Sequence, residues 1–246
     1  MTADRRTRLW SLVVEHARGR PITVEHVCAA VMSATGLDGA AVTVLGTGFR
    51  ETVYASDDVA SDLAELTLTL GEGPAADAVA GAPELVADLT TPDCLVRWPV
   101  FAPAAMRTGV RAVFALPMRV GAVRIGVLDL YRARPGVLDR EQLADVLMLA
   151  DTVCALLLDA AQHDRSRPDG RWPEQAGLHH PEVHQATGMV TVQLGVSAAV
   201  ALIRLRAYAY SHDRRLRDVA SDVVARRLRF SPDLGPGSDE GGGTDR

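Results

Sequence analysis

Apolar residues recur at intervals of three and four along two stretches near the start of the chain, residues 4–17 and 23–35. This spacing gathers apolar side chains on one face of an α-helix. Gly36 follows the second stretch, as is typical at the end of a helix. The pattern therefore predicts two amphipathic helices. The positions that recur at three and four are Leu9, Leu12, Val13, His16 and Ala17 in the first, and Val24, Val27, Cys28, Val31 and Met32 in the second.

Four further stretches have the residue types and lengths of β-strands, and they form two pairs. AAVTVLG and FRETVYAS, residues 40–46 and 49–56, flank a short glycine-containing turn. RAVFALPMRV and VRIGVLDLYR, residues 111–120 and 123–132, are joined at Gly121-Ala122. Each pair predicts an antiparallel hairpin.

A third helical pattern covers residues 139–161, and Asp139 is suited to cap it. An antiparallel sheet with helices at both ends of its sequence is an α+β domain. We therefore expect a sheet with flanking helices up to the end of this helix. The apolar positions of the long helix are Leu143, Val146, Leu147, Ala150, Val153, Cys154 and Leu157.

The stretch RSRPDGRWPEQAGLHHP, residues 165–181, is rich in proline, glycine and mixed charge, and it predicts a linker that we place at 163–180. The next 50 residues or so show three short helical patterns, which predict a small all-α bundle. Residues suited to the helix ends are Pro181 at the start of the first, Gly195 after it, Ser197 before the second, and Asp213 or Ser211 before the third. The expected buried faces are Val183, Ala186, Thr187, Val190 and Leu194; Ala201, Leu202, Leu205 and Ala209; and Leu216, Val219, Ala220, Val223 and Val224.

Charge is distributed unevenly along the chain. All 26 basic residues are arginine, and the net charge is −6 over residues 1–174, +4 over 175–231 and −3 over 232–246. A small basic module following an acidic body indicates two separate tasks. The last 15 residues are rich in proline, glycine and acids and have little to bury, so we expect them to be disordered.

Several function classes are disfavoured by what the chain does not contain. No apolar run is long enough for a membrane span, and the charged N-terminus does not resemble a secretion signal, so a cytoplasmic location is expected. Three well-separated cysteines argue against a disulfide framework or a zinc site. His180 and His184 have metal-ligand spacing but no evident further ligand, so no metal is expected. No catalytic constellation stands out, which predicts that the protein is not an enzyme.

Residues 22–162 resemble a GAF domain, the small-molecule sensor module of many bacterial signalling proteins. The resemblance rests on GEGPAADAVAGAPELVADL (71–89), with Gly71-Glu72-Gly73-Pro74 entering a helix, and on the strand that begins at Gly126 in GVLDLYR. It implies a central antiparallel sheet and is compatible with an unidentified small-molecule ligand, although no cofactor is evident. Asp129 alternates with Leu128 and Leu130, so it faces either a pocket or solvent.

Residues 181–231 closely resemble an ANTAR domain, the RNA-binding module of bacterial transcription antitermination regulators. HQATGMVTVQLG, ALIRLRAYA and LRDVASDVV carry the resemblance. It implies a bacterial regulator whose partner is RNA, in the form of hairpin loops in leader transcripts. The expected RNA-binding residues are Gln185, Ala186, Gly188, Met189, Arg204, Arg206, Arg215 and Arg217. A homodimer is expected through the helices at 4–17 and 139–161.

Simpler interpretations stay open for several of these residues. Ala186 and Gly188 are also the small residues that close helix packing requires. Tyr208 and Tyr210 are candidates for base stacking, but alternate residues cannot share one helix face. Four-residue spacing predicts that Asp222 pairs with Arg226, and Arg214 with Asp218, which removes them from the free charges. The arginines then left for RNA are Arg217, Arg215, Arg206, Arg204 and Arg229.

The resemblances predict the boundaries 1–21 for an N-terminal helix, 22–162 for the GAF domain, 163–180 for the linker, 181–231 for the ANTAR domain and 232–246 for the tail. The function they imply is a signal-responsive, RNA-binding antitermination regulator. Two alternatives remain, a DNA-binding helix-turn-helix protein and a non-catalytic protein–protein adaptor.

Overall fold

The chain forms two compact units, Met1–His179 and His180–Arg246, in a computed structural model that describes residues 2–46, 49–164 and 181–231. Buried apolar residues occur in both units, so each has a core of its own. The linker and the acidic tail expected from the sequence lie outside the described residues, as does the turn at 47–48.

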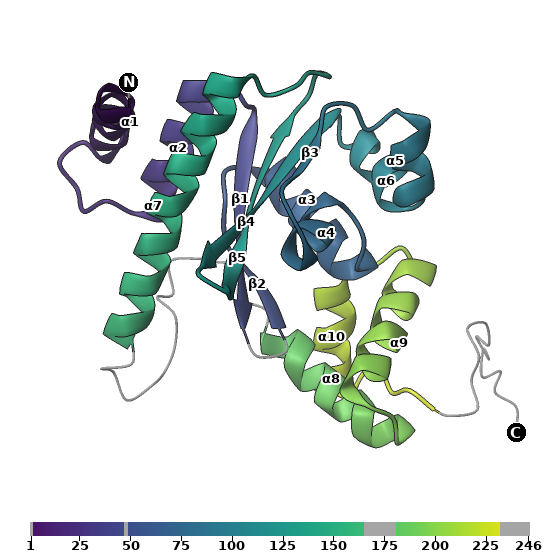
Figure 1. Ribbon diagram of the computed structural model, residues 1–246. Coiled ribbons are helices and arrows are strands. Elements are labelled where there is room, and N and C mark those ends of the chain that lie inside the picture. Colours follow the sequence, from purple (N-terminus) through teal and green to yellow (C-terminus); the bar gives the residue numbers. More distant parts are fainter. Residues whose placement is uncertain (1, 47–48, 165–180, 232–246) are drawn as a thin grey trace, which may run out of the picture. The chain divides into compact units, whose positions relative to one another are not determined.

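The first unit is built on a five-stranded antiparallel sheet with the strand order β2-β1-β5-β4-β3 (Figure 1). Both predicted hairpins are confirmed, because β1 pairs with β2 and β4 with β5. Val120 pairs with Val123, so Gly121 and Ala122 alone form the second turn. The strands are β1 (Gly39–Gly46), β2 (Phe49–Ala55), β3 (Glu84–Val86), β4 (Ala112–Val120) and β5 (Val123–Arg132).

The middle strand, β5, contains a glycine that the sheet requires. A Cβ atom at Gly126 would collide with the backbone carbonyl of Thr43 on β1. The sequence GVLDL therefore begins with the residue that lets β1 and β5 approach. The rest of β5 alternates, with Leu128 and Leu130 in the core cluster on one face and Asp129 on the other.

Helices α2 (Val24–Thr35) and α7 (Arg140–Asp164) cover one face of the sheet, and α1 (Thr2–Ala17) packs against these two helices (Figure 1). All three confirm predicted helices, and α2 ends at Gly36 as expected. Asp139 caps α7 by accepting a hydrogen bond from the backbone N of Gln142 at 2.8 Å. Leu147 was expected in the buried face but is 44% exposed, so that assignment was wrong. The buried stripe follows Val146, Leu149, Ala150, Val153 and Leu157, and Leu147 lies beside it.

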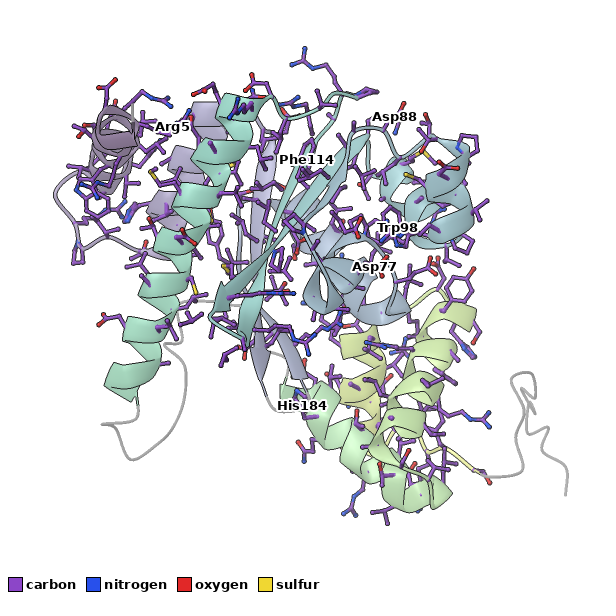
Figure 2. The ribbon with its side chains drawn as sticks, viewed as in Figure 1. Arg5, Asp77, Asp88, Trp98, Phe114 and His184 are labelled. Carbon is purple, nitrogen blue, oxygen red and sulfur yellow. The ribbon has the colours of Figure 1, made fainter. Side chains whose placement is uncertain are left out.

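Helix α1 contacts α7 through salt bridges as well as through its apolar face. The buried carboxylate of Asp145 lies 3.0 Å from Nε of Arg5 and 2.5 Å from Nη2 of Arg8, and Arg5 also contacts Glu141 (Figure 2). Leu9 and Val13 of α1 belong to the same core cluster as α2 and α7. The N-terminal helix is therefore an integral layer of the first unit.

The opposite face of the sheet is covered by α3 (Asp58–Leu70) and α4 (Pro74–Ala80), while α6 (Phe101–Arg107) packs against α3 and α5 (Pro92–Arg97) packs against α6 (Figure 1). The helix expected after Gly73-Pro74 is α4, and the other three were not predicted. Glu72 ties the start of α4 to α6, because its carboxylate accepts from the backbone N of Val100 and of Phe101 at 2.8 and 2.6 Å. Trp98 Nε1 donates to Asp77 of α4 at 3.0 Å (Figure 2).

The second unit consists of α8 (Pro181–Leu194), α9 (Ala198–Ser211) and α10 (Leu216–Val224), which confirms the predicted three-helix bundle. Gly195 ends α8, and the Ser197 hydroxyl accepts from the backbone N of Val200 at the start of α9, as expected. The buried residues are Val183, Ala186, Val190, Ala201, Leu205, Ala209, Leu216, Val219, Ala220 and Val223.

The predicted cap of the third helix was wrong. Asp213 lies in the turn with a φ of +48°, and the Ser211 hydroxyl donates to the carbonyl of Tyr208 instead. The N-cap of α10 is Arg215, whose side chain makes no capping hydrogen bond. Residues 212–215 form the turn between α9 and α10, so α10 starts later in the sequence than its candidate caps suggest.

Among the described residues, no single helix is long and apolar enough to cross a membrane. Helices α8 and α9 meet that test only when they are taken together, across a bend of 105°.

Candidate nucleic-acid interface

The second unit has a surface groove between α8 and the segment that follows α10, here called the α8 groove. Three residues expected to contact RNA, Gln185, Gly188 and Met189, lie in it together with two arginines. The lining residues are Gln185, Gly188, Met189, Val192, Gln193, Arg226 and Arg229.

The helical period of α8 explains why these side chains gather. Val183, Ala186 and Val190 face the core, so the residues at 185, 188, 189, 192 and 193 fall on the outward side. The segment after α10 returns beside this face, because the backbone N of Phe230 donates to Oε1 of Gln193 at 2.9 Å. The groove therefore has one wall of helix and one wall of returning chain.

Gly188 stands in open space within α8. A Cβ atom at this position would have no heavy atom within 4 Å apart from its own helix and neighbours. Close helix packing therefore gives no reason for a glycine here. Ala186, by contrast, is completely buried, so its small size serves the core and the packing interpretation holds for it.

Arg226 lines the groove, although the sequence predicted that an ion pair would occupy it. The expected ion pair with Asp222 is wrong, because α10 ends at Val224 and Arg226 has a φ of +61°. Asp222 instead accepts from Arg214 at 2.6 Å and from Arg227 at 2.7 Å. These two hydrogen bonds lower the pKa of Asp222, and the bond to Asp222 raises the pKa of Arg214. The expected pair of Arg214 with Asp218 is therefore replaced as well.

The remaining predicted arginines lie outside the groove. Arg204 and Arg206 are on α9, and Arg215 and Arg217 are at the start of α10. Arg204 and Arg215 are exposed, whereas Arg206 and Arg217 are half-buried. Arg217 Nε lies 3.5 Å from the carboxylate of Asp218. The groove thus brings together three of the eight expected RNA-binding residues and Arg229, which the sequence left as a further candidate for RNA, and it adds Arg226, which the sequence had assigned to an ion pair.

The two tyrosines of α9 separate as the helical period requires. Tyr208 is half-buried and stacks on His212, with ring centroids 3.9 Å apart. Tyr210 is 59% exposed. Of the two, only Tyr210 presents enough of its ring to stack with a base.

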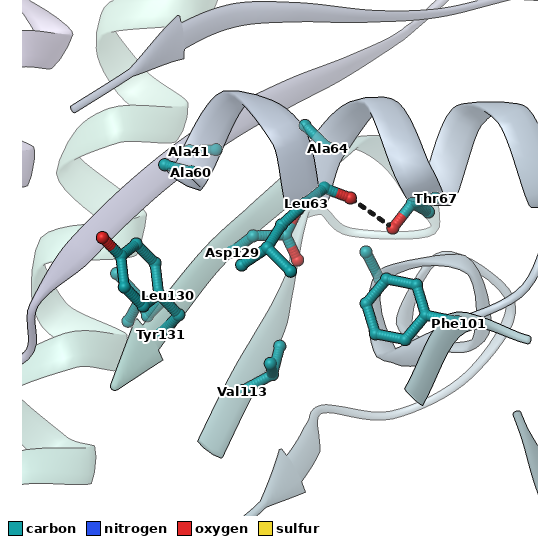
Figure 3. Close-up of a pocket in the computed structure, with 11 residues that line it drawn as sticks. Ala41, Ala60, Leu63, Ala64, Thr67, Phe101, Val113, Asp129, Leu130 and Tyr131 are labelled. Carbon is teal, nitrogen blue, oxygen red and sulfur yellow. Dashed lines mark hydrogen bonds between the residues drawn. The ribbon is translucent and has the colours of Figure 1, made fainter. Parts of the chain in front are cut away.

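The first unit has its own candidate site, beneath α3 on the face of the sheet opposite α2 and α7 (Figure 3). Two adjoining cavities of about 20 Å³ each share Ala64, Thr67, Ala75 and Asp129. Each cavity has room for about one water molecule. One of them is mainly apolar, with Leu63, Phe101, Val113 and Tyr131 among its lining residues, and the other includes Thr43, Arg50 and Thr52.

Asp129 is the acidic group of this site. Its Oδ1 atom is buried and has no hydrogen-bond partner among the described residues. Burial raises the pKa of Asp129 to about 7, and the positive charge of Arg50 opposes that rise. Of the two orientations that the sequence left open, the structure therefore shows the one toward a pocket.

Asp129→Asn is expected to stabilise the first unit at pH 8 and to leave its stability unchanged near pH 4. The folded carboxyl keeps its proton up to about pH 7, whereas the unfolded one loses it near pH 4, so stability falls as the pH rises between these values. We expect the variant's free energy of unfolding at pH 8 to exceed that of the parent by about 2 kcal/mol. This is less than the full energy of the pKa shift, because Asp129 as a whole is only half-buried. Urea unfolding of both proteins at pH 4, 6 and 8 measures it. A variant that is less stable than the parent at pH 8 would contradict the assignment.

No group of three or more His, Cys, Asp or Glu side chains in the described ranges is arranged to hold a metal ion. His184 is exposed, and His180, its expected companion, lies outside those ranges.

Comparisons with known proteins agree with this architecture. The family model of the GAF domain matches residues 22–157, and that of the ANTAR domain matches residues 174–224. A comparison with curated proteins found no match.

Several solved structures are similar to the chain at low identity. The GAF domain of a phosphoenolpyruvate-protein phosphotransferase from Coxiella burnetii is 14% identical with a TM-score of 0.47, over 67% of this chain and 99% of that one. The corresponding Acinetobacter domain is 10% identical with a TM-score of 0.46, over 66% and 96%. The GAF domain of a sensor histidine kinase from Bacillus halodurans is 10% identical with a TM-score of 0.44, over 57% and 97%.

Both matched families are regulatory domains, and ANTAR domains bind RNA. At the family level, their combination is that of a signal-regulated RNA-binding regulator. Because the GAF model covers more than half of the sequence and the ANTAR match follows it, the chain belongs to the GAF-domain family and carries an ANTAR domain after its GAF domain.

Proposed function

We propose that this protein is a non-catalytic, cytoplasmic regulator that promotes transcription antitermination. Its ANTAR domain binds the loops of paired RNA hairpins in leader transcripts, and its GAF domain controls that binding in response to a signal. The control passes through α7 and the linker that follows it. The observation that carries the RNA-binding part is the α8 groove, which combines two arginines with an exposed helix backbone at Gly188.

The chemistry of the groove suits a single-stranded RNA loop. Sequence-specific RNA binding relies on splayed bases held by stacking, hydrogen bonds and basic side chains. Gln185 and Gln193 offer amide donors and acceptors, and Arg226 and Arg229 offer charge to phosphates. Gly188 leaves room for a nucleotide to approach the helix backbone. Arg204, Arg206, Arg215 and Arg217 are proposed as a second set of phosphate contacts outside the groove.

A competition experiment tests the proposal. The full-length protein is mixed with a labelled two-hairpin RNA, and unlabelled duplex DNA or the same RNA is added at fixed salt. We expect the RNA to compete and the duplex to compete only weakly. Preference for the duplex would favour a helix-turn-helix DNA-binding protein, and binding of neither would favour a protein–protein adaptor.

Gly188→Ala is expected to stabilise the ANTAR domain and weaken RNA binding at the same time. Alanine favours the helix by about 1 kcal/mol over glycine, and the open space at this position gives it nothing to clash with. The added methyl group would stand where we place a nucleotide. Thermal unfolding and RNA titration of the same preparations measure both effects. A stabilised variant with unchanged RNA affinity would show that the nucleotide does not approach this part of α8.

We also propose that the protein is a homodimer through α1 and α7. Trp10 and Val14 of α1 are each 48% exposed and lie four residues apart, and Leu147 of α7 is 44% exposed. Large apolar side chains grouped on a surface mark interaction sites. Trp10→Arg/Val14→Glu should therefore shift the mass found by analytical ultracentrifugation from dimer to monomer. A parent protein that stays monomeric at every concentration would refute the dimer.

A further inference from the structure

We propose that the acidic segment at residues 232–246 binds in the α8 groove of the same molecule and competes there with RNA. The contact between segment and groove stands on its own, whereas the competition rests on the proposed function. The partner of the groove is thus an acidic peptide segment with one apolar anchor.

The groove and the acidic segment carry opposite charges. Arg226 and Arg229 form no ion pair within the described part of the chain, whereas the nearby Asp222 is taken up by Arg214 and Arg227. Two guanidinium groups in one groove favour a carboxylate partner. The segment that follows has a net charge of −3, with Asp239 and Glu240 adjacent in its sequence.

The same groove also exposes apolar surface. Val192 is 83% exposed and Met189 is half-buried, and both line the groove beside the arginines. The acidic segment contains a single large apolar residue, Leu234. A groove that combines exposed apolar and basic side chains matches a segment that combines leucine with acids.

The acidic segment begins close to the groove in sequence. The hydrogen bond from Phe230 N to Gln193 holds the backbone at the rim of the groove, only one residue before the described part ends at Ser231. Leu234 follows four residues after Phe230, and four residues span at most about 14 Å. A short tether gives an effective concentration in roughly the millimolar range, so a contact that would be weak between separate molecules is populated within one.

The contact is tested first without RNA. Leu234 is replaced by the photo-crosslinking residue p-benzoylphenylalanine in the full-length protein, which is irradiated at low concentration so that crosslinks form within one molecule. Mass spectrometry is expected to find crosslinks to residues 185–193. These crosslinks should be lost when Arg226→Ala/Arg229→Ala is added and kept when Arg204→Ala is added, because Arg204 lies outside the groove. Crosslinks that avoid α8, or that persist without the two arginines, would overturn the proposal.

The competition is tested in full-length protein with Asp239→Asn/Glu240→Gln. At low salt this variant should bind a two-hairpin RNA about fivefold more tightly than the parent, and the difference should vanish at high salt. Glu15→Gln/Asp93→Asn removes two exposed acids of the first unit and should have a smaller effect. Equal RNA affinity of parent and tail variant would overturn the competition. If neither binds RNA but the crosslinks to α8 remain, the proposed function fails and the contact of segment and groove is retained.

Discussion

Arg226→Ala/Arg229→Ala is expected to lower the affinity for a two-hairpin RNA between roughly tenfold and a hundredfold, because contacts of this kind contribute about 1 kcal/mol or more each. The two residues line the same groove as Gln185, Gly188 and Met189, and they form no ion pair within the described ranges. Their charge is therefore available to phosphates. A plot of the logarithm of RNA affinity against the logarithm of salt concentration should become less steep, by the amount expected for the loss of about two phosphate contacts.

The matched control is Arg227→Ala. Arg227 lies next to Arg226 in sequence and is bonded to Asp222, which keeps Arg214 as a partner when Arg227 is removed. The control lowers the positive charge of the domain without touching the groove. If Arg227→Ala weakens RNA binding as much as a single groove substitution does, net charge alone explains the effect and the groove is not the binding site. Circular dichroism of each variant shows that the helices are intact.

Leu205→Ala is expected to unfold the ANTAR domain while the GAF domain stays folded. Leu205 is completely buried in the three-helix core, and truncation of a buried leucine to alanine costs about 2–5 kcal/mol. A core built from about 50 residues has little more stability than that to lose. Calorimetry of the parent should show two transitions, and the variant should keep only the transition of the GAF domain. The variant should also lose RNA binding, because its ANTAR domain is unfolded.

The same helix offers the control for this prediction. Ile203 of α9 is 61% exposed, so Ile203→Ala removes a similar side chain without opening the core. We expect it to leave both transitions nearly unchanged. If Leu205→Ala instead lowers the melting temperature of the whole chain in a single transition, the two units do not unfold independently.

Much of the fold could be predicted because its longest elements have strong periodicity. The two hairpins, α1, α2, α7 and the three helices of the ANTAR domain all follow from spacing, glycine stops and capping residues. Helices α3, α5 and α6 and strand β3 were not predicted. Strand β3 and helices α5 and α6 have only three, six and seven residues, so neighbouring chain segments decide their structure. Helix α3 was missed although it has 13 residues, Asp57 as its N-cap and Gly71 at its end, which are signals that the sequence contains.

At the candidate sites, tertiary contacts override the spacing of residues along the sequence. Four-residue spacing paired Asp222 with Arg226, but that rule holds only while the helix continues, and α10 stops at Val224. The return of the chain to α8, which places Arg226 and Arg229 in the groove, depends on tertiary contacts such as the bond between Phe230 and Gln193. For Asp129, the alternation of β5 left two orientations, and only the position of α3 distinguishes a pocket from solvent. The assignment of individual residues to RNA stays a prediction.

The left-handed backbone of Arg226 has a consequence for engineering this protein. At a φ of +61° a side chain such as arginine costs the backbone about 1 kcal/mol, which glycine would avoid. A laboratory selection for heat resistance alone should therefore drift toward glycine at position 226, and toward alanine at position 188. Both changes would make the domain more stable and its groove less able to bind a ligand. Libraries made from this chain need a selection for ligand capture alongside the one for heat resistance.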